Sequence, residues 1–436
     1  MLGIVVRIGS LLAGIAILLL GHGLTNTLLA LRAAAEGYSD GLVGAVMAAY
    51  FAGFILGTFV CPPLINRVGH IRVFAAAAGV GGAVVIFQGL FVHPGFWVLG
   101  RLLFGLCVVA VYMVVESWLN RRTDNTLRGR VFAVYNLVNL AAMAGGQLLL
   151  WFGDVRGLEL FALGGALFCL GLVPVALTRM PEPEPVTLAR LHLFELARRL
   201  PLAAAAAGFA GAAAGALLAL GPLFARQAGL SDDGAAAFMA AAIAGGALLQ
   251  WPIGRWSDHA DRRRVLAVTA AGAAAIAAVL GGLPGQAALL LPLAGVYGGL
   301  AYTVYPLGVA LANDRAAAEG SPDTVGLSAN LLLAYGLGAT VGPLLAGGAM
   351  ELLGRAGLPL VLAACWSPVA ALASWRRGPA SIEGASSHFV ITTRTTPVAL
   401  EAQIEDAQAA ETASASAAAA SCPGRRGKQG SEPPGI

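Results

Sequence analysis

Charged side chains are scarce in this sequence of 436 residues, and lysine is almost missing. Lys428 is the only lysine, and Asp, Glu, Lys and Arg together make up 11% of the chain. A soluble domain carries about 25% of these residues. Hydrophobic residues reach 58%. One soluble core could not bury so large an apolar share, so we expect lipid to surround much of the molecule.

Several kinds of chemical site are also absent from the sequence. No G-x-x-x-x-G-K-[ST] phosphate loop occurs, because Lys428 stands in Gly-Lys-Gln, and this excludes an intrinsic ATPase pump. The five cysteines form no C-x-x-C pair and no Cys/His cluster, and they are interpreted as small packing residues. We therefore expect no metal and no cofactor. The arginines fall in short loops and not on one basic face, which argues against nucleic acid as a partner.

Twelve apolar runs follow one another, each suited to cross a bilayer core of about 30 Å as a helix. They lie near Ile8–Leu31, Val43–Ile65, Val73–Val92, Phe96–Leu119, Val131–Phe152, Leu158–Leu177, Leu200–Ala225, Ala235–Ile253, Val265–Leu283, Ala287–Ala312, Val325–Ala346 and Leu358–Ala373. The runs lack the alternation of barrel strands. The sequence therefore predicts an all-α integral membrane protein with twelve transmembrane helices.

The arginines predict the orientation of these helices. With the N terminus in the cytoplasm, eighteen arginines fall in the inner segments and four in the outer ones. Positive residues collect on the cytoplasmic side of membrane proteins. We therefore expect both termini in the cytoplasm and, for a bacterial protein, a multi-pass location in the inner membrane.

An internal repeat appears at an offset of 192 residues. It pairs Ser39 with Ser231, Asp40 with Asp232, and Gly53 with Gly245. An even number of helices in each half gives the two copies the same orientation, so they are parallel repeats. We predict an N-terminal six-helix bundle over residues 1–178, a cytoplasmic linker over 179–199, a C-terminal bundle over 200–376 and a disordered tail over 377–436.

The loop after the eighth run has a distinctive pattern. It reads Gly254-Arg-Trp-Ser-Asp258-His-Ala-Asp261 and continues into Arg262, Arg263 and Arg264. It resembles the G-x-x-x-D-R-x-G-R-R signature of the major facilitator superfamily, which lies between helices 2 and 3 and again between helices 8 and 9. His259 replaces an arginine of the signature, and Asp261 replaces a glycine.

The first copy of the signature is weaker. Pro62 and Asn66 stand where the glycine and the aspartate belong, and Arg67 and Arg72 follow. Arg101-Leu-Leu-Phe-Gly105 resembles the superfamily's R-x-x-x-G motif of helix 4. The resemblance covers residues 1–376 and implies the superfamily fold of two parallel six-helix repeats. Segments 114–118 (VVESW), 128–130 (RGR), 305–306 (YP) and 330–343 are similar to the YcaD-type branch.

The second-half loop has a physical role in this interpretation. An acid at the end of one helix can face the positive N-terminal end of a neighbouring helix and hold the inner gate shut. Asp258 can do this with Arg262 and Arg263, whereas the neutral Asn66, beside Arg67 and Arg72, can do it only weakly. We predict an asymmetric inner gate. The alternative is that these basic loops only fix the topology.

Two charged residues lie within the fourth run. Glu116 is well inside a predicted span, and an ionisable group there is a functional hypothesis by default. Spacing places Arg101, Gly105, Tyr112 and Glu116 on one helix face, with about 22 Å between Arg101 and Glu116 at 1.5 Å per residue. Glu116 is interpreted as a proton carrier or gate switch, or else as a static salt-bridge partner of a nearby arginine. Arg101 is either a substrate or gating contact or a packing anchor.

Polar and aromatic residues at mid-span suggest a cavity for the solute. They lie in runs 1, 4, 5, 10 and 11, and the superfamily resemblance implies that runs 1, 5, 10 and 11 line a central cavity: Asn26, Tyr112, Asn136, Asn139, Gln147, Tyr302, Tyr305, Asn330 and Tyr335. Such residues can equally serve as hydrogen-bonding contacts between helices. Gly338–Gly347 of run 11 predicts close packing and a bend at Pro343.

The resemblance implies a secondary transporter that moves a small solute by rocking one half against the other. We expect proton-coupled symport through Glu116, a monomeric protein in a lipid bilayer, and no enzyme activity, since no catalytic cluster appears. The alternatives are drug or metabolite efflux, uniport without proton coupling, and a lipid flippase on the same fold.

Overall fold

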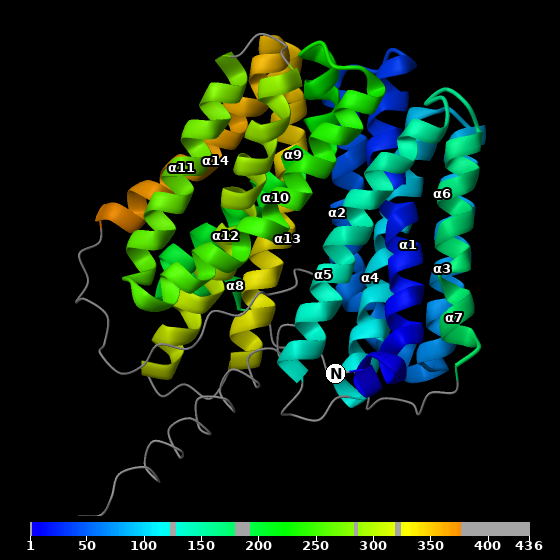
Figure 1. The fold of residues 1–436 in the computed structure, drawn as a ribbon, viewed down its shortest axis with the longest axis horizontal. Helices are drawn as coiled ribbons and strands as arrows, with labels where there is room; N and C mark the ends of the chain where they lie inside the picture. Colours follow the sequence, from blue (N-terminus) through cyan, green and yellow to red (C-terminus); the bar gives the residue numbers. More distant parts are fainter. Residues whose placement is uncertain (1, 123–127, 179–191, 283–286, 319–323, 376–436) are drawn as a thin grey trace, which may run out of the picture.

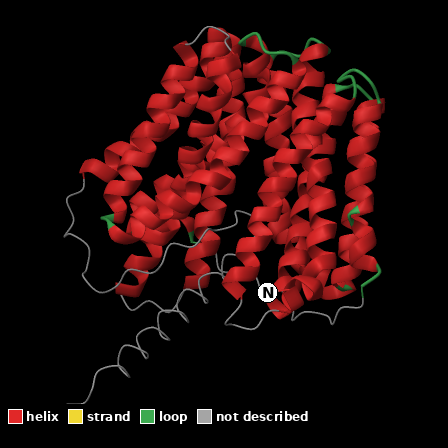
Figure 2. Ribbon diagram, viewed as in Figure 1, coloured by secondary structure: helices red, strands yellow, loops and turns green. Residues whose placement is uncertain are grey.

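The computed structural model describes residues 2–122, 128–178, 192–282, 287–318 and 324–375. These residues form helices and short connections without a strand (Figure 2). The first half comprises α1 (Leu2–Ala35), α2 (Asp40–Val68), α3 (His70–Leu90), α4 (Pro94–Arg122), α5 (Arg128–Leu148), the 3₁₀ turn η1 (Leu149–Phe152), α6 (Glu159–Leu170) and α7 (Leu172–Ala176). The second comprises α9 (Pro201–Gln227), α10 (Asp232–His259), α11 (Arg262–Gly282), α12 (Ala287–Ala318), α13 (Thr324–Leu353), η2 (Gly354–Ala356) and α14 (Gly357–Trp375).

A short helix, α8 (Leu193–Arg199), lies between the halves. It forms within the predicted linker, and the side chain of Leu196 is buried. Residues 179–191 of that linker and the predicted tail over 377–436 lie outside the described residues. The linker therefore includes an ordered helical turn in front of α9.

The described helices give twelve membrane crossings. Eleven helical stretches are long and apolar enough to span a bilayer, and the last of them, Gly326–Trp375, contains both α13 and α14. These two helices pack against each other on either side of η2, so this stretch crosses twice. α6 and α7 together make the sixth crossing. The predicted class, an all-α membrane protein with twelve transmembrane helices, is confirmed.

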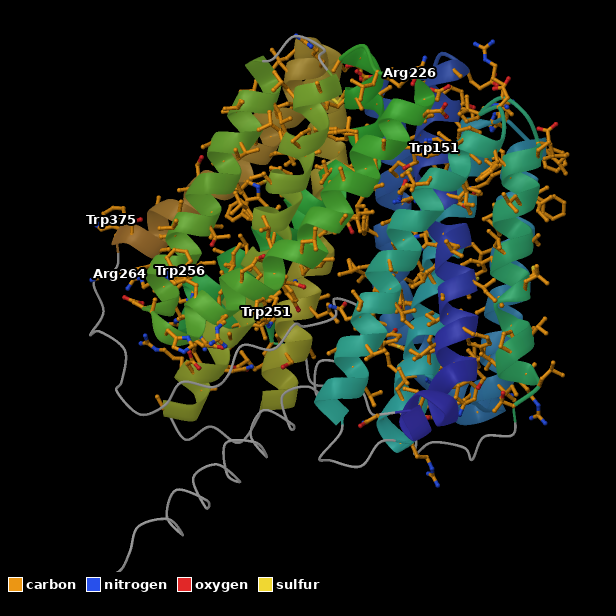
Figure 3. The ribbon with its side chains drawn as sticks, in the orientation of Figure 1. Trp151, Arg226, Trp251, Trp256, Arg264 and Trp375 are labelled. Carbon is orange, nitrogen blue, oxygen red and sulfur yellow. The ribbon has the colours of Figure 1, made fainter. Side chains whose placement is uncertain are left out.

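Apolar side chains on the outer surface match a lipid environment. Leu137, Leu248 and Leu345 are 61%, 73% and 55% exposed, although each is in the middle of a long helix. Trp251, Trp256 and Trp375 project from the outside of the second half (Figure 3). Leucine suits the hydrocarbon core, and tryptophan suits its boundary with water. The chain thus has apolar residues on both its inner and its outer faces.

The two halves lie side by side and meet along matching helices (Figure 1). α2 packs against α13, α5 packs against α10, and α1 packs against α9. The repeat maps α1 onto α9, α2 onto α10 and α5 onto α13. The contact of α2 with α13 is therefore equivalent to that of α5 with α10, and the contact of α1 with α9 joins two equivalent helices. This arrangement is the two-fold relation expected of parallel repeats.

Small residues let the helices of each half approach closely. A Cβ atom at Gly53 of α2 would collide with the backbone of Leu102 in α4, and one at Gly245 of α10 would collide with the backbone of Gly295 in α12. These glycines are a pair in the sequence repeat. The repeat therefore preserves a backbone contact between the second and fourth helices of each half.

The repeated Ser-Asp pair begins a helix in each half. Ser39 Oγ accepts the N–H of Leu42 at 3.3 Å, and Ser231 Oγ accepts the N–H of Gly234 at 3.1 Å. Each serine is an N-cap that satisfies a free amide of the first turn. α2 and α10 therefore begin in the same way and at the same end of the bundle.

Candidate functional site

Two ends of the bundle are distinguished below. The closed end is the one that carries residues 36–39, 153–158 and 228–231, and the basic end is the one that carries Arg67, Arg72 and residues 260–264. α4 runs from the closed end to the basic end and brings a cation and a carboxylate into the bundle at different depths. Arg101 and Glu116 are both 0% exposed.

Arg101 lies in the part of α4 nearer the closed end and reaches α1. Its Nη2 donates to Asn26 Oδ1 at 2.5 Å, and its Cζ lies 4.8 Å from the centre of the Tyr50 ring and 5.6 Å from that of Phe104. The remaining guanidinium nitrogens, Nε and Nη1, have no hydrogen-bond partner. Within the described part of the chain, Arg101 makes no ion pair with a carboxylate.

His22 completes this group of side chains, which we call the Arg101 cluster: Arg101, Asn26, His22, Tyr50 and Phe104. The His22 ring lies 5.3 Å from the Tyr50 ring and 5.5 Å from the Phe104 ring. Both of its ring nitrogens are buried without a hydrogen-bond partner. The Arg101 cluster therefore holds buried donors, on Arg101 and on one ring nitrogen of His22, that have no bonded acceptor.

Glu116 lies nearer the basic end in a separate polar group. The Tyr135 hydroxyl of α5 donates to Glu116 Oε1 at 3.0 Å. Tyr112 is buried one turn before Glu116 on α4. Arg101 and Glu116 thus have different partners, as their predicted spacing requires.

The other predicted residues of α5 have different surroundings. Gln147 is fully buried, and its side-chain oxygen accepts a hydrogen bond from Thr27 of α1. Asn136 is buried one residue after Tyr135. Gln147 thus joins two helices of one half, which is the packing role considered above for such residues.

The predicted residues of the second half have several kinds of partner. Tyr305 of α12 and Tyr335 of α13 stack with their ring centres 5.0 Å apart, and the Tyr302 carbonyl accepts from Gln250 Nε2 at 3.2 Å. Asn330 lies nearer the basic end, where its Oδ1 accepts the N–H of His192 at 2.6 Å. Asn330 therefore contacts the segment that leads into α8.

The second-half loop at the basic end is held by ion pairs within that half. Arg262 Nη2 lies 3.2 Å from Asp258 Oδ1, and Arg262 Nε lies 3.4 Å from Asp314 Oδ2 of α12. Arg263 Nε donates to the carbonyl of Ala373 at 2.8 Å and so ties α11 to the end of α14. The corresponding residues of the first half, Asn66, Arg67 and Arg72, are exposed.

Bonds between the halves occur at the closed end. Glu351 Oε2 of α13 accepts the backbone N–H of Gly41 at 3.2 Å in the first turn of α2. Gln227 Nε2 of α9 donates to Asp40 at 3.0 Å, and Trp151 Nε1 donates to the carbonyl of Asp233 at 3.2 Å. A carboxylate at the start of a helix is stabilised by the free amides and the dipole there. We call these three contacts the closed-end latch.

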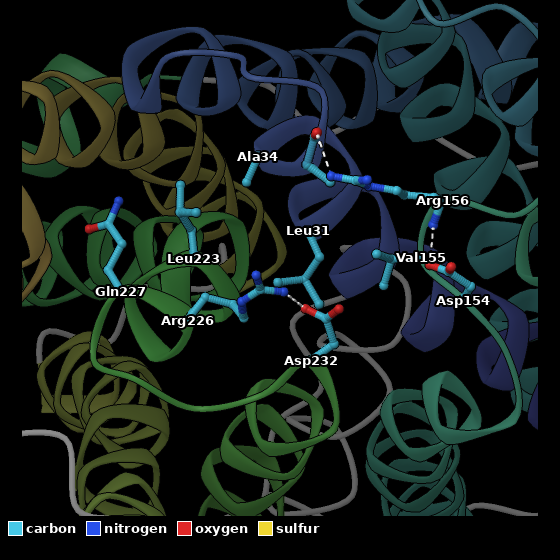
Figure 4. Close-up of a pocket in the computed structure, with 10 residues that line it drawn as sticks. Leu31, Ala34, Asp154, Val155, Arg156, Leu223, Arg226, Gln227 and Asp232 are labelled. Atoms are coloured by element: carbon cyan, nitrogen blue, oxygen red, sulfur yellow. Dashed lines mark hydrogen bonds and ion pairs between the residues drawn. The ribbon is translucent and has the colours of Figure 1, made fainter.

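A cavity of about 590 Å³ lies beside the latch (Figure 4). α1, α9, the start of α10 and the connection before α6 surround it, with Leu31, Asp154, Arg156, Arg226 and Asp232 in its wall. Arg226 and Asp232 form an ion pair across this space. The cavity is a polar recess at the closed end between the two halves.

Sequence reasoning missed the latch and the aromatic part of the Arg101 cluster. Asp40 was recognised only as a repeat residue, and Glu351, Gln227 and Trp151 lie at helix ends where polar residues are ordinary. Tyr50 and Phe104 are aromatic residues in apolar runs, which carry no signal by themselves. For a metal, the described residues offer no group of three or more His, Cys, Asp or Glu side chains.

Known proteins similar to this chain are transporters. The family model of the Major Facilitator Superfamily matches residues 11–332. The uncharacterised MFS-type transporter YcaD of Escherichia coli is 29% identical over 337 residues, which cover 76% of this chain and 86% of that protein. YcaD of Escherichia fergusonii is 27% identical over 336 residues, with the same coverage.

Solved transporters share the fold. The nucleoside transporter NupG has a TM-score of 0.71 at 13% identity and covers 84% of this chain and 96% of its own. A D-xylose-proton symporter has a TM-score of 0.67 at 16% identity, with 86% of this chain and 99% of that chain covered. At such identities the likeness shows the arrangement of the helices alone.

Proposed function

The chain belongs to the Major Facilitator Superfamily, and we propose that it is a secondary active transporter that moves a small solute across the cytoplasmic membrane by alternating access. Its family and its transporter-named relatives identify it as a transporter and not an enzyme. The observation that carries the proposal is the position of the polar bonds. The latch joins the halves at the closed end, whereas Arg262 at the basic end pairs within one half.

In this mechanism the two halves rock about the solute, so that the latch breaks when contacts form at the opposite end. Asp258 is an acid available for those contacts, and in the state described here it pairs with Arg262, which also pairs with Asp314. The exposed Asn66 of the first half has no charge to contribute. The gate at the basic end is therefore asymmetric in our proposal.

We assign the basic end to the cytoplasm. Eighteen arginines lie in the segments on that side, against four on the other. Fusions test this assignment. A fluorescent protein after residue 436 should fluoresce, and alkaline phosphatase inserted after residue 92 at the closed end should be active. An inactive phosphatase at that position would mean that the closed end, and not the basic end, faces the cytoplasm.

Glu116 is our candidate for proton coupling. Its carboxyl group is fully buried and bonded to Tyr135, and it lies on α4 near the basic end. A carboxylate inside a span is costly unless its charge is neutralised or paired. Protonation in one state and release in the other would link solute movement to the proton gradient.

The test is Glu116→Gln in proteoliposomes with an imposed proton gradient. The variant should lose accumulation of the solute against its own gradient and keep solute exchange, because glutamine resembles the protonated carboxyl group. Glu159→Gln, at the exposed start of α6, is the matched control and should behave as wild type. Unchanged accumulation in Glu116→Gln would place coupling elsewhere and leave uniport as the mechanism.

A further inference from the structure

The Arg101 cluster has more positive charge and more donors than its own residues can use. Arginine is permanently charged, and Nε and Nη1 of Arg101 together carry three N–H groups without an acceptor. His22 adds one ring N–H beside them, since a neutral imidazole has one donor and one acceptor nitrogen. The single polar acceptor described for the guanidinium is the neutral side chain of Asn26.

The charge of Arg101 is therefore balanced only in part. The Tyr50 and Phe104 rings face the guanidinium and provide cation–π attraction, which is weaker than a carboxylate partner. A buried cation without a counter-charge destabilises a protein and is retained where function needs it. What the cluster lacks is an anion.

The cluster lies beside the junction between the halves. Tyr50 belongs to α2, which packs against α13 of the second half, where the tilted rings of Tyr335 and Tyr305 lie with their centres 5.0 Å apart. One turn further along α2, Ile55 lies close to Gly336 of α13. The Tyr50 ring covers one face of the guanidinium, so rotation of this one side chain would uncover Arg101 on that face.

We propose that the transported solute is an organic anion whose carboxylate, or a comparable acidic group, binds Arg101 and His22 when the Tyr50 ring moves aside. The inference rests on the proposed transport function, because it names the class of solute for that function. The guanidinium fork matches a carboxylate or phosphate in two parallel hydrogen bonds, while Asn26 fixes its orientation from the other side.

The experiment is a thermal-shift screen of the purified protein with matched pairs of compounds. Each carboxylic acid is paired with its primary amide, and each phosphate monoester with its parent alcohol. Stabilising compounds should be acids, whose neutral partners give no shift. The preferred acid type then identifies the group as carboxylate or phosphate.

Variants of Arg101 connect binding with this residue. Arg101→Gln should raise the concentration of acid needed for half-maximal stabilisation at least tenfold, and Arg101→Lys should raise it less while it retains the preference for acids. Arg264→Gln is the control, because that arginine is 87% exposed at the basic end, and its acid response should equal that of wild type. If Arg101→Gln does not fold, the lysine variant decides by the same measurement.

Three results would overturn the proposal: no acid stabilises the protein, neutral partners stabilise it as well as acids do, or the Arg101 variants respond to acids as wild type does. Uptake of the stabilising compounds into proteoliposomes separates this inference from the transport function. Binding of an acid without uptake would refute transport alone. Uptake of a neutral solute that is independent of Arg101 would refute the proposal that the solute is an anion and would leave the transport function standing.

Discussion

At the scale of single residues, α4 keeps its buried charged side chains, Arg101 and Glu116, apart from each other, and each has a polar partner of its own. Glu116 accepts from Tyr135, and Arg101 donates to Asn26. Hydrogen bonds to a charged group contribute about 1.5–3 kcal/mol, more than neutral ones. The bond between Tyr135 and Glu116 can therefore be measured as a coupling energy.

We expect a double-mutant cycle of Tyr135→Phe and Glu116→Gln to give a coupling of about 1 kcal/mol in the free energy of unfolding, because glutamine can still accept the bond but carries no charge. Reversible unfolding in detergent is the measurement. Tyr297→Phe serves as the control, because its hydroxyl accepts from Trp366 Nε1 at 3.1 Å in the other half. It should show no coupling to Glu116→Gln. A coupling near zero for Tyr135 would mean that the carboxyl group does not use this bond.

The sequence predicted the two buried charged residues of α4 but not their partners. Arg101 and Glu116 stand out because a charge within an apolar run is rare and costly. Their partners could not be identified, because Asn26 and Tyr135 lie on other helices whose rotation about their axes is set by packing. The contact of Asn330 with His192 was likewise hidden, since it depends on where the linker lies.

At the scale of helices, glycine positions decide how closely the crossings pack. The contact of Gly53 with the backbone of Leu102 leaves no room for a methyl group. Gly79 of α3 has open space around its Cβ position. A glycine-to-alanine substitution can therefore be compared between the crowded Gly53 and the open Gly79.

Gly53→Ala should lower the free energy of unfolding by about 1–3 kcal/mol, because α2 and α4 must move apart. Gly79→Ala should leave it unchanged or raise it by up to about 1 kcal/mol, because alanine is the better helix former. Thermal unfolding of the two variants measures the difference. Equal melting temperatures would mean that α2 and α4 are not in backbone contact.

Helix positions were the most predictable feature of the fold. All twelve apolar runs became crossings, because the bilayer requires every spanning backbone to bond internally. Helix ends differ by several residues, since polar ends such as Asp232 and Asp40 continue beyond the apolar run. α8 was missed because its seven residues carry too short a pattern to detect.

At the scale of the whole molecule, equivalent contacts between the halves differ in chemistry. α2 meets α13 through the Glu351 carboxylate, whereas η1, which follows α5, meets α10 through the Trp151 indole. The repeat predicted that the halves correspond. It could not predict which end is closed, because that is a state of an equilibrium and not a property of either half.

Glu351→Gln should shift this equilibrium away from the state described here. A carboxylate at a helix N-terminus contributes about 1 kcal/mol, so the closed-end population should fall about fivefold relative to the open one. Spin labels at Phe91 and Leu353, which are 55% and 57% exposed at that end, report the change as longer distances. Glu36→Gln breaks an ion pair with Arg32 inside one half and should leave the distances unchanged. An unaltered distribution in Glu351→Gln would remove Glu351 from the latch.

In the latch contact between Gly41 and Glu351, natural substitutions of the two residues would have different effects. On the α2 side the donor is a main-chain amide, which every residue except proline retains, but a Cβ atom at Gly41 would collide with the Glu351 carboxylate. That carboxylate is the flexible end of its side chain and can shift, so a small side chain at position 41 would weaken the contact without abolishing it. On the α13 side, exchange of Glu351 for aspartate, glutamine or a smaller residue weakens the contact by degrees. Natural variants that adjust the balance between the two access states would arise at Glu351, whereas on the α2 side only proline at position 41 would remove the donor itself.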